Sequence, residues 1–137
     1  MDEPLNLVLF SGTDDRLQSA AVLAAGAAAL GKPVNIFLQY WALDAFRAGR
    51  IGDDHGLAPE AGPAGRAAVD ALAAAGQSPW FATLRQAKEL GTVDIQACSL
   101  SMDLLEIEEA DLDPLVDGVE GVTAFYLNAG EGQVVFI

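Results

Sequence analysis

The sequence predicts an α/β fold with an open, mainly parallel sheet and helices on both of its faces. Short apolar runs typical of buried strands alternate with alanine-rich segments typical of helices. The beginning of the chain reads as strand, helix and strand, a parallel crossover unit of the usual length. The 137 residues are 52% hydrophobic, which is enough to bury one core. We therefore expect a single domain over residues 1–137.

The first crossover unit starts with an apolar run at residues 5–10, expected to be a buried strand. A helix is expected from about Arg16 to Leu30, because its alanines favour helix and Thr13 offers an N-cap just before it. An extended run at residues 34–41 predicts the second strand. An alanine-rich helix face can lie close to such a sheet.

The pattern weakens over residues 42–66, where glycine and proline crowd together. Such an excursion in a small domain is a binding loop, a lid, an assembly element or a mobile segment, and the sequence leaves these alternatives open, most of all for residues 49–65. Two helices are expected after it, at residues 67–75 and 79–90, the second capped by Ser78.

The last third of the chain predicts two further strands. Residues 93–98 alternate like a third strand, and a short helix is expected immediately after them, over 99–105. A helical turn at 108–112 and a final strand at 132–137 complete the pattern. Residues 119–127 carry β-branched and aromatic side chains that suit a strand, but a parallel sheet needs a crossover before its last strand, so we predict a helix there.

Charge and residue counts exclude several classes of function. Seven basic against twenty acidic residues give a net charge of −13, which disfavours binding to nucleic acid or to an anionic membrane surface. One cysteine and one histidine cannot build a structural zinc site, and Cys98 has no partner for an intramolecular disulfide. Adjacent carboxylates such as Asp14 and Asp15 are expected to cap helices or face water, so no metal is predicted. The nucleotide, phosphate and redox motifs GxGxxG, Walker and CxxC are absent.

The location of the protein is expected to be the cytoplasm. The acidic start at residues 1–4 lacks the basic region of a secretory signal, and no apolar stretch reaches the roughly 20 residues of a membrane span.

Ligands of parallel α/β sheets bind beyond the carboxyl ends of the strands. Three loops are expected to meet there, and they contain Ser11 and Gly12, Tyr40 and Trp41, and Cys98 with Ser99 and Ser101. These seven residues are the candidate site. The amide groups at the expected helix start would stabilise a Cys98 thiolate, with the two serine hydroxyls as further donors.

Other interpretations of these residues stay open. A lone cysteine is often a buried small hydrophobe, and both serines have an equally good role as helix caps. Residues 89–137 contain eleven acidic and no basic residues, so cationic help for Cys98 must come from elsewhere. His55 is expected to be a solvated loop residue, and we predict no Cys–His catalytic pair. The apolar stretches at 80–81 and 125–127 are candidates for subunit contacts, or else for core.

Several segments of the chain resemble the DsrE-like small proteins of sulfur relay, the family of DsrE, DsrF, DsrH and the related TusD. The matching segments are Leu7–Gly12, Ala25–Gly31, Val34–Phe37, Tyr40–Leu43, Ala87–Gly91 and Ile95–Leu104. The most specific block runs from Ala97 to Leu105 and looks like the cysteine segment of soluble stand-alone members.

This resemblance implies a three-layer α/β/α sandwich with a five-stranded, mainly parallel sheet, assembled into homo- or hetero-oligomers in which trimers and hexamers are prominent. In members that carry it, the cysteine corresponding to Cys98 accepts sulfane sulfur as a persulfide, and partner proteins donate or receive that sulfur. The chain would then be a sulfurtransferase or sulfur carrier, and such exchange requires no cofactor. A pocket closed by Tyr40 and Trp41 would protect the persulfide.

Two other functions remain open on the sequence. The first is a small-molecule or nucleotide-binding module in which Cys98 only lines the wall of the crevice. The second is a thiol redox protein in which Cys98 forms a sulfenate.

Overall fold

The structure is a computed structural model that describes residues 3–137, so the first two residues of the acidic start lie outside it. Five parallel strands form one sheet in the order β4-β3-β2-β1-β5. The predicted α/β class is confirmed, and so is the five-stranded parallel sheet. The elements in chain order are β1 (Leu5–Leu9), α1 (Asp14–Ala29), β2 (Val34–Leu38), α2 (Tyr40–Ala45), a 3-10 turn η1 (Pro59–Ala61), α3 (Gly62–Ala74), α4 (Trp80–Leu90), β3 (Val93–Cys98), α5 (Ser99–Leu105), a 3-10 turn η2 (Glu109–Asp111), β4 (Gly118–Glu120), α6 (Val122–Ala129) and β5 (Val134–Phe136).

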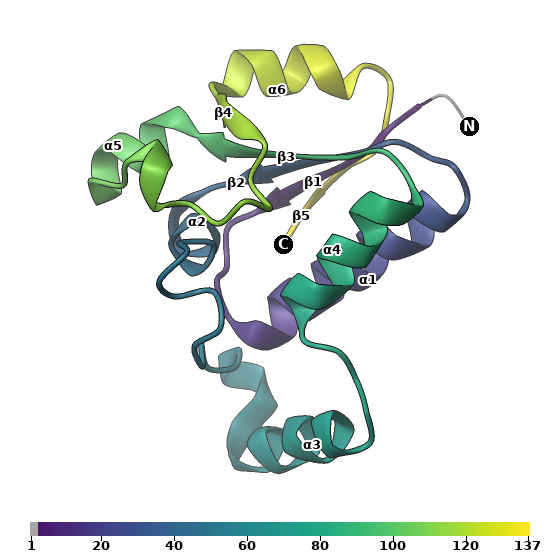
Figure 1. Cartoon of the computed structure of the whole chain (residues 1–137), viewed down its shortest axis with the longest axis vertical. Helices are drawn as coiled ribbons and strands as arrows, with labels where there is room; N and C mark the ends of the chain where they lie inside the picture. Colours follow the sequence, from purple (N-terminus) through teal and green to yellow (C-terminus); the bar gives the residue numbers. More distant parts are fainter. Residues whose placement is uncertain (1–2) are drawn as a thin grey trace.

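The helices divide unequally between the two faces of the sheet. α1 and α4 lie side by side on one face, α6 lies over the other, and α3 stands away from both layers (Figure 1). α2 and α5 contact each other beyond the carboxyl ends of the central strands. Within residues 3–137, no helix is both long and apolar enough to cross a membrane.

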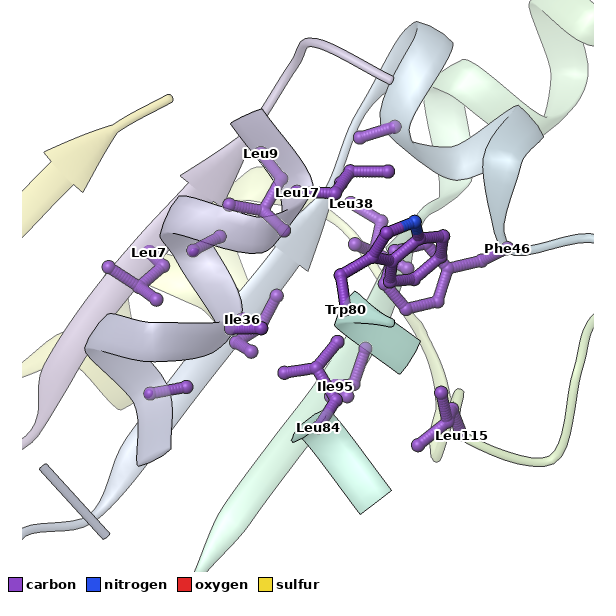
Figure 2. Close-up of a cluster of buried hydrophobic side chains, with 14 of the residues drawn as sticks. Leu7, Leu9, Leu17, Ile36, Leu38, Phe46, Trp80, Leu84, Ile95 and Leu115 are labelled. Carbon is purple, nitrogen blue, oxygen red and sulfur yellow. The ribbon is translucent and has the colours of Figure 1, made fainter. Parts of the chain in front are cut away.

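The main core fills the space between the sheet and the α1/α4 layer. Alternate side chains of the three central strands point to this side, as the two-residue period of a strand requires. Figure 2 shows several of them around the buried Trp80 and Phe46 rings, which lie 5.0 Å apart. The strand residues of this core are Leu7, Leu9, Val34, Ile36, Leu38, Val93, Ile95 and Ala97.

The alanines of α1 allow close packing, as the sequence suggested. Ala20, Ala21, Ala24 and Ala28 are all buried on the face of α1 that meets the core. The fit extends to the end of α4, where a β-carbon at Gly91 would lie 3.0 Å from the carbonyl oxygen of Ala28. Larger side chains would push the helices away from each other and from the sheet.

The second strand is shorter than the predicted range of 34–41. It ends at Leu38, and a short helix, α2, starts at Tyr40, whose φ of 44° turns the backbone sharply. The amide of Ala42 then donates to the carbonyl of Phe10 at 3.0 Å. The bulky side chains of Tyr40 and Trp41, which favour a longer strand, therefore start a helix whose first turn is hydrogen-bonded to the residue that follows β1.

The predicted helix at 119–127 is wrong in its first part. Gly118–Glu120 form β4, the edge strand beside β3, and α6 begins only at Val122. The predicted helical crossover before the last strand is present, because α6 connects β4 to β5. An eight-residue helix is enough for this connection, which frees Val119 for the strand its β-branched side chain favours.

The Gly/Pro-rich excursion is shorter than expected at both ends, since α2 occupies its beginning and α3 starts at Gly62. Proline at residue 63 is compatible with the first turn of a helix, so α3 begins before the predicted Ala67. The N-cap of α4 is Pro79 and not Ser78. Thr13 is the N-cap of α1, but its side chain makes no capping hydrogen bond.

Candidate functional site

The loops after β1 and β2 meet at the carboxyl edge of the sheet. The Phe10 and Tyr40 rings lie 5.1 Å apart, and Ser11 Oγ lies 3.4 Å from the hydroxyl of Thr13. A β-carbon at Gly12 would collide with the carbonyl oxygen of Trp41, so glycine is required for this approach. The structure thus brings Ser11, Gly12, Tyr40 and Trp41 together, as the sequence predicted.

Cys98 stands at the junction that the sequence predicted, as the last residue of β3 and the N-cap of α5. Its surroundings differ from the open crevice that we expected. The residue is only 5% exposed and packs in a small hydrophobic cluster with Phe37 and Phe125, against which Val8 is also packed. The two rings are stacked with centroids 5.0 Å apart. The sulfur is therefore enclosed between the sheet and α6.

Tyr40 and Trp41 lie outside the hydrophobic cluster around Cys98. Tyr40 packs on Phe10, and Trp41 is 55% exposed. The rings beside the thiol are Phe37 and Phe125, which we had not included in the site. Alternation along the second strand carries a signal for Phe37, because this residue faces the opposite side from its core neighbours Ile36 and Leu38. No comparable signal singles out Phe125.

The two serines of α5 have different environments. Ser101 is fully buried, and its Oγ has no hydrogen-bond partner among the described residues. Ser99 is exposed at the helix start, beside Gly121. Ser101 is three residues after the N-cap, the position from which a side chain reaches back toward the N-cap residue. Its hydroxyl is therefore a buried polar group of α5 that no other described residue uses.

Negative charge dominates the surroundings of α5. A hollow of about 540 Å³ beside it is lined by Ser99 and Val119 and by four acidic residues, Asp103, Glu106, Glu108 and Glu109. Glu120 is paired in register with Cys98 across β3 and β4. Burial and the neighbouring Asp94 carboxylate raise the pKa of Glu120, against a hydrogen bond from Asn128. Small anions approaching this region meet an unfavourable potential.

His55 does not pair with Cys98. Its ring lies 6.2 Å from Trp80, in the layer on the opposite side of the sheet from the cysteine. His55 lies in a loop, as expected, but it is less solvated than expected, because the residue is half-buried and its Nε2 is shielded from solvent. Across residues 3–137, no group of three or more His, Cys, Asp and Glu side chains is arranged to hold a metal ion.

Comparisons with known proteins agree with the α/β fold and identify relatives of the chain. Residues 1–56 match the model of the DsrE/DsrF/DrsH-like family. The uncharacterized protein YrkE of Bacillus subtilis is 30% identical over 148 residues, covering 93% of this chain and 92% of its own. MTH1491 of Methanobacterium thermoautotrophicum, a protein of unknown function, superposes with a TM-score of 0.60 at 14% identity over 99% of this chain and all of its own.

A further fold match is the YchN protein of E. coli, with a TM-score of 0.57 at 14% identity and full coverage of both chains. The structural matches establish the shared fold, and the sequence matches establish the relationship. The chain belongs to the DsrE/DsrF/DrsH-like family.

Proposed function

We propose that this protein carries sulfane sulfur on Cys98 and passes it to a partner thiol. The observation that carries the proposal is the place of the chain's one cysteine, at the end of β3 and the start of α5 in a DsrE-like fold. The family is linked to sulfur relay. Exposed amides at a helix start favour a thiolate, which is the nucleophile in sulfur exchange.

The transfer is a pair of balanced displacements. The Cys98 thiolate attacks the outer sulfur of a donor persulfide, forming a new S–S bond while the donor's own S–S bond breaks and its thiolate leaves. An acceptor thiolate then attacks the outer sulfur on Cys98, and the Cys98 thiolate leaves in turn. Each step exchanges one persulfide for another, so no net oxidant, reductant or cofactor is consumed.

Enclosure of the thiol supports storage rather than open exchange. A persulfide within the Phe37–Phe125 cluster would be shielded from the small thiols that otherwise remove its outer sulfur. Loading then requires α6 to move, because Phe125 belongs to that helix. Glycines flank α6 on both sides, and Gly130 has a φ of 56°. These are suitable positions for such a movement.

The partners that we propose are sulfur-donor and sulfur-acceptor proteins, together with further copies of this chain in a trimer or hexamer. Apolar side chains on the outer surface of α5 and α6 support the second part of this proposal. Leu100 and Leu104 are 62% and 57% exposed, and Tyr126 and Leu127 are 64% and 78% exposed. Light scattering of the purified chain measures the state of assembly directly.

Sulfur loading of the wild type and of variants at Cys98, Ser101 and Ser99 tests the chemistry at Cys98. After incubation with inorganic polysulfide, intact-mass spectra of the wild type should show added sulfur, and Cys98→Ser should show none. Ser101→Ala should shorten the lifetime of the adduct several-fold, because the buried hydroxyl is lost as a donor, whereas the exposed Ser99→Ala should leave it unchanged.

Three other outcomes would count against the proposal or against one part of it. A wild type that gains no sulfur would favour the alternative of a non-catalytic, buried cysteine. Equal lifetimes in the two serine variants would remove Ser101 from the site. A sulfenate formed with peroxide in place of the persulfide would point to the redox alternative.

A further inference from the structure

A second hollow lies far from Cys98, between α3 and the rest of the chain. It has a volume of about 400 Å³, within the range of small-molecule sites. α3 contributes no buried residue and stands apart from the α1/α4 layer (Figure 1). Leu72 and Val69 of α3 line the hollow, and the Leu72 side chain is 53% exposed. The apolar side of α3 thus faces a space that no other part of the described chain fills.

The opposite wall combines aromatic rings with carboxylates. Trp80 and Phe81 at the start of α4 provide the rings, which lie 5.4 Å apart edge to face. Asp14, Asp15 and Asp53 also line the hollow, and no lysine or arginine is among the described residues that do so. Apolar walls with charge of one sign select a ligand that has an apolar body and the opposite charge.

Two of the carboxylates are held in place by their own hydrogen bonds. Asp14 accepts from the Trp80 indole N–H at 3.1 Å and from the amide of His55 at 3.0 Å. Asp15 accepts from the amide of Ala58 at 3.1 Å. Burial raises the pKa of Asp15, but hydrogen bonds from Thr13, Ala58 and Arg16 outweigh this and lower it overall. Asp15 therefore stays ionised, and the exposed Asp53 is the carboxylate free to contact a ligand directly.

We propose that this hollow binds a small organic cation, an ammonium group on an apolar body. The ammonium group lies against the carboxylates, with Asp53 as its direct partner, and the apolar body packs between Leu72 and Phe81. Organic anions are excluded by the same carboxylates. The site is independent of Cys98 and of sulfur transfer.

Calorimetric titration with three related probes tests both parts of this proposal. The cation 2-phenylethylammonium should bind, whereas 2-phenylethanol should bind more weakly and 3-phenylpropanoate should not bind. Asp53→Asn should weaken binding of the cation about two- to fivefold, because one partly solvated ion pair is lost. The control is Glu89→Gln on the exposed part of α4, which should bind the cation like the wild type. Leu72→Ser should weaken it as well, with Leu23→Ser on α1 as its control.

The same titration separates this site from the sulfur chemistry, because Cys98→Ser should bind the cation like the wild type. The proposal would be overturned by no binding of the cation at millimolar concentration, by equal affinity for the three probes, or by unchanged affinity in Asp53→Asn. Loss of binding in Cys98→Ser alone would place the cation elsewhere and would also overturn it.

Discussion

The two faces of the sheet differ in what they bury. The face under α1 and α4 is apolar along all three central strands. On the face under α6, the alternate positions of the same strands carry the polar residues Asn6, Asn35, Asp94 and Gln96. Within the described chain, the only cluster of buried apolar residues on this face is the one that contains Cys98. One face therefore provides most of the hydrophobic stabilisation, and the other is free to hold polar and reactive groups.

The polar face is ordered by amide hydrogen bonds. Asn6, fully buried on β1, donates to the carbonyls of Ala129 and Gln133 at 3.2 Å, which fixes the end of α6 against the sheet. Asn35 donates to the side-chain oxygen of Asn6 at 3.0 Å and to the carbonyl of Asn128 at 3.2 Å. A short helix thus stays on a sheet that offers it little apolar surface. Such a cover can open at a lower cost than the α1/α4 layer.

The largest effect is expected on the apolar face. Leu7→Ala should lower the free energy of unfolding by about 2–5 kcal/mol, because a fully buried side chain is lost and leaves a cavity. Urea denaturation measures this change, with the half-exposed Leu23→Ala as a control expected within about 0.5 kcal/mol of the wild type. A small loss in Leu7→Ala would mean that the two faces do not differ in this way.

A smaller effect is expected from the amide that holds α6. Asn6→Ala should lower the free energy of unfolding by about 1–3 kcal/mol, because the side-chain hydrogen bonds to the carbonyls of Ala129 and Gln133 are lost and Asn35 loses its side-chain acceptor. It should also speed alkylation of Cys98 by iodoacetamide, because α6 is released. The exposed Thr123→Ala, on the same helix, should change neither quantity. Destabilisation with no change in alkylation would show that α6 does not control access to the thiol.

The sequence predicted the apolar face better than the polar one. Alternation and alanine content identified the core strands and α1, since burial on one side imposes a regular pattern. The edge strand β4 has three residues, too few for a period to show, and most of it lies in the range where the sequence predicts a helix. The sequence predicted the position of Cys98 between β3 and α5, but not the aromatic side chains that enclose it. Phe125 reaches it only through the placement of α6, which depends on contacts distant in sequence.

The smallest effect concerns pH. Burial and Asp94 raise the pKa of Glu120 in the folded state above its unfolded value, so the folded chain binds this proton more tightly. The resulting stability is complete below the unfolded pKa and is lost as pH rises through the folded one. Glu120→Gln should therefore be more stable than the wild type at neutral pH by less than about 1 kcal/mol, given solvent screening.

Thermal melts at acidic and neutral pH measure this difference. It should vanish below about pH 4, where the carboxyl group is protonated in both states. If Glu120→Gln instead became less stable than the wild type as pH rises, the pKa of Glu120 would be lowered in the folded state and not raised.

Sulfur loading of the folded chain, compared with the chain unfolded in urea, tests the role of Cys98 most directly. Both samples are treated with polysulfide and then with an excess of a small thiol, and the sulfur on the Cys98 peptide is measured by mass spectrometry before and after the thiol is added. We predict that the folded protein gains sulfur and retains it, whereas the unfolded chain loses it to the thiol. A folded chain that gains none, while the unfolded chain is modified, would show that Cys98 is a sealed core residue and not a carrier.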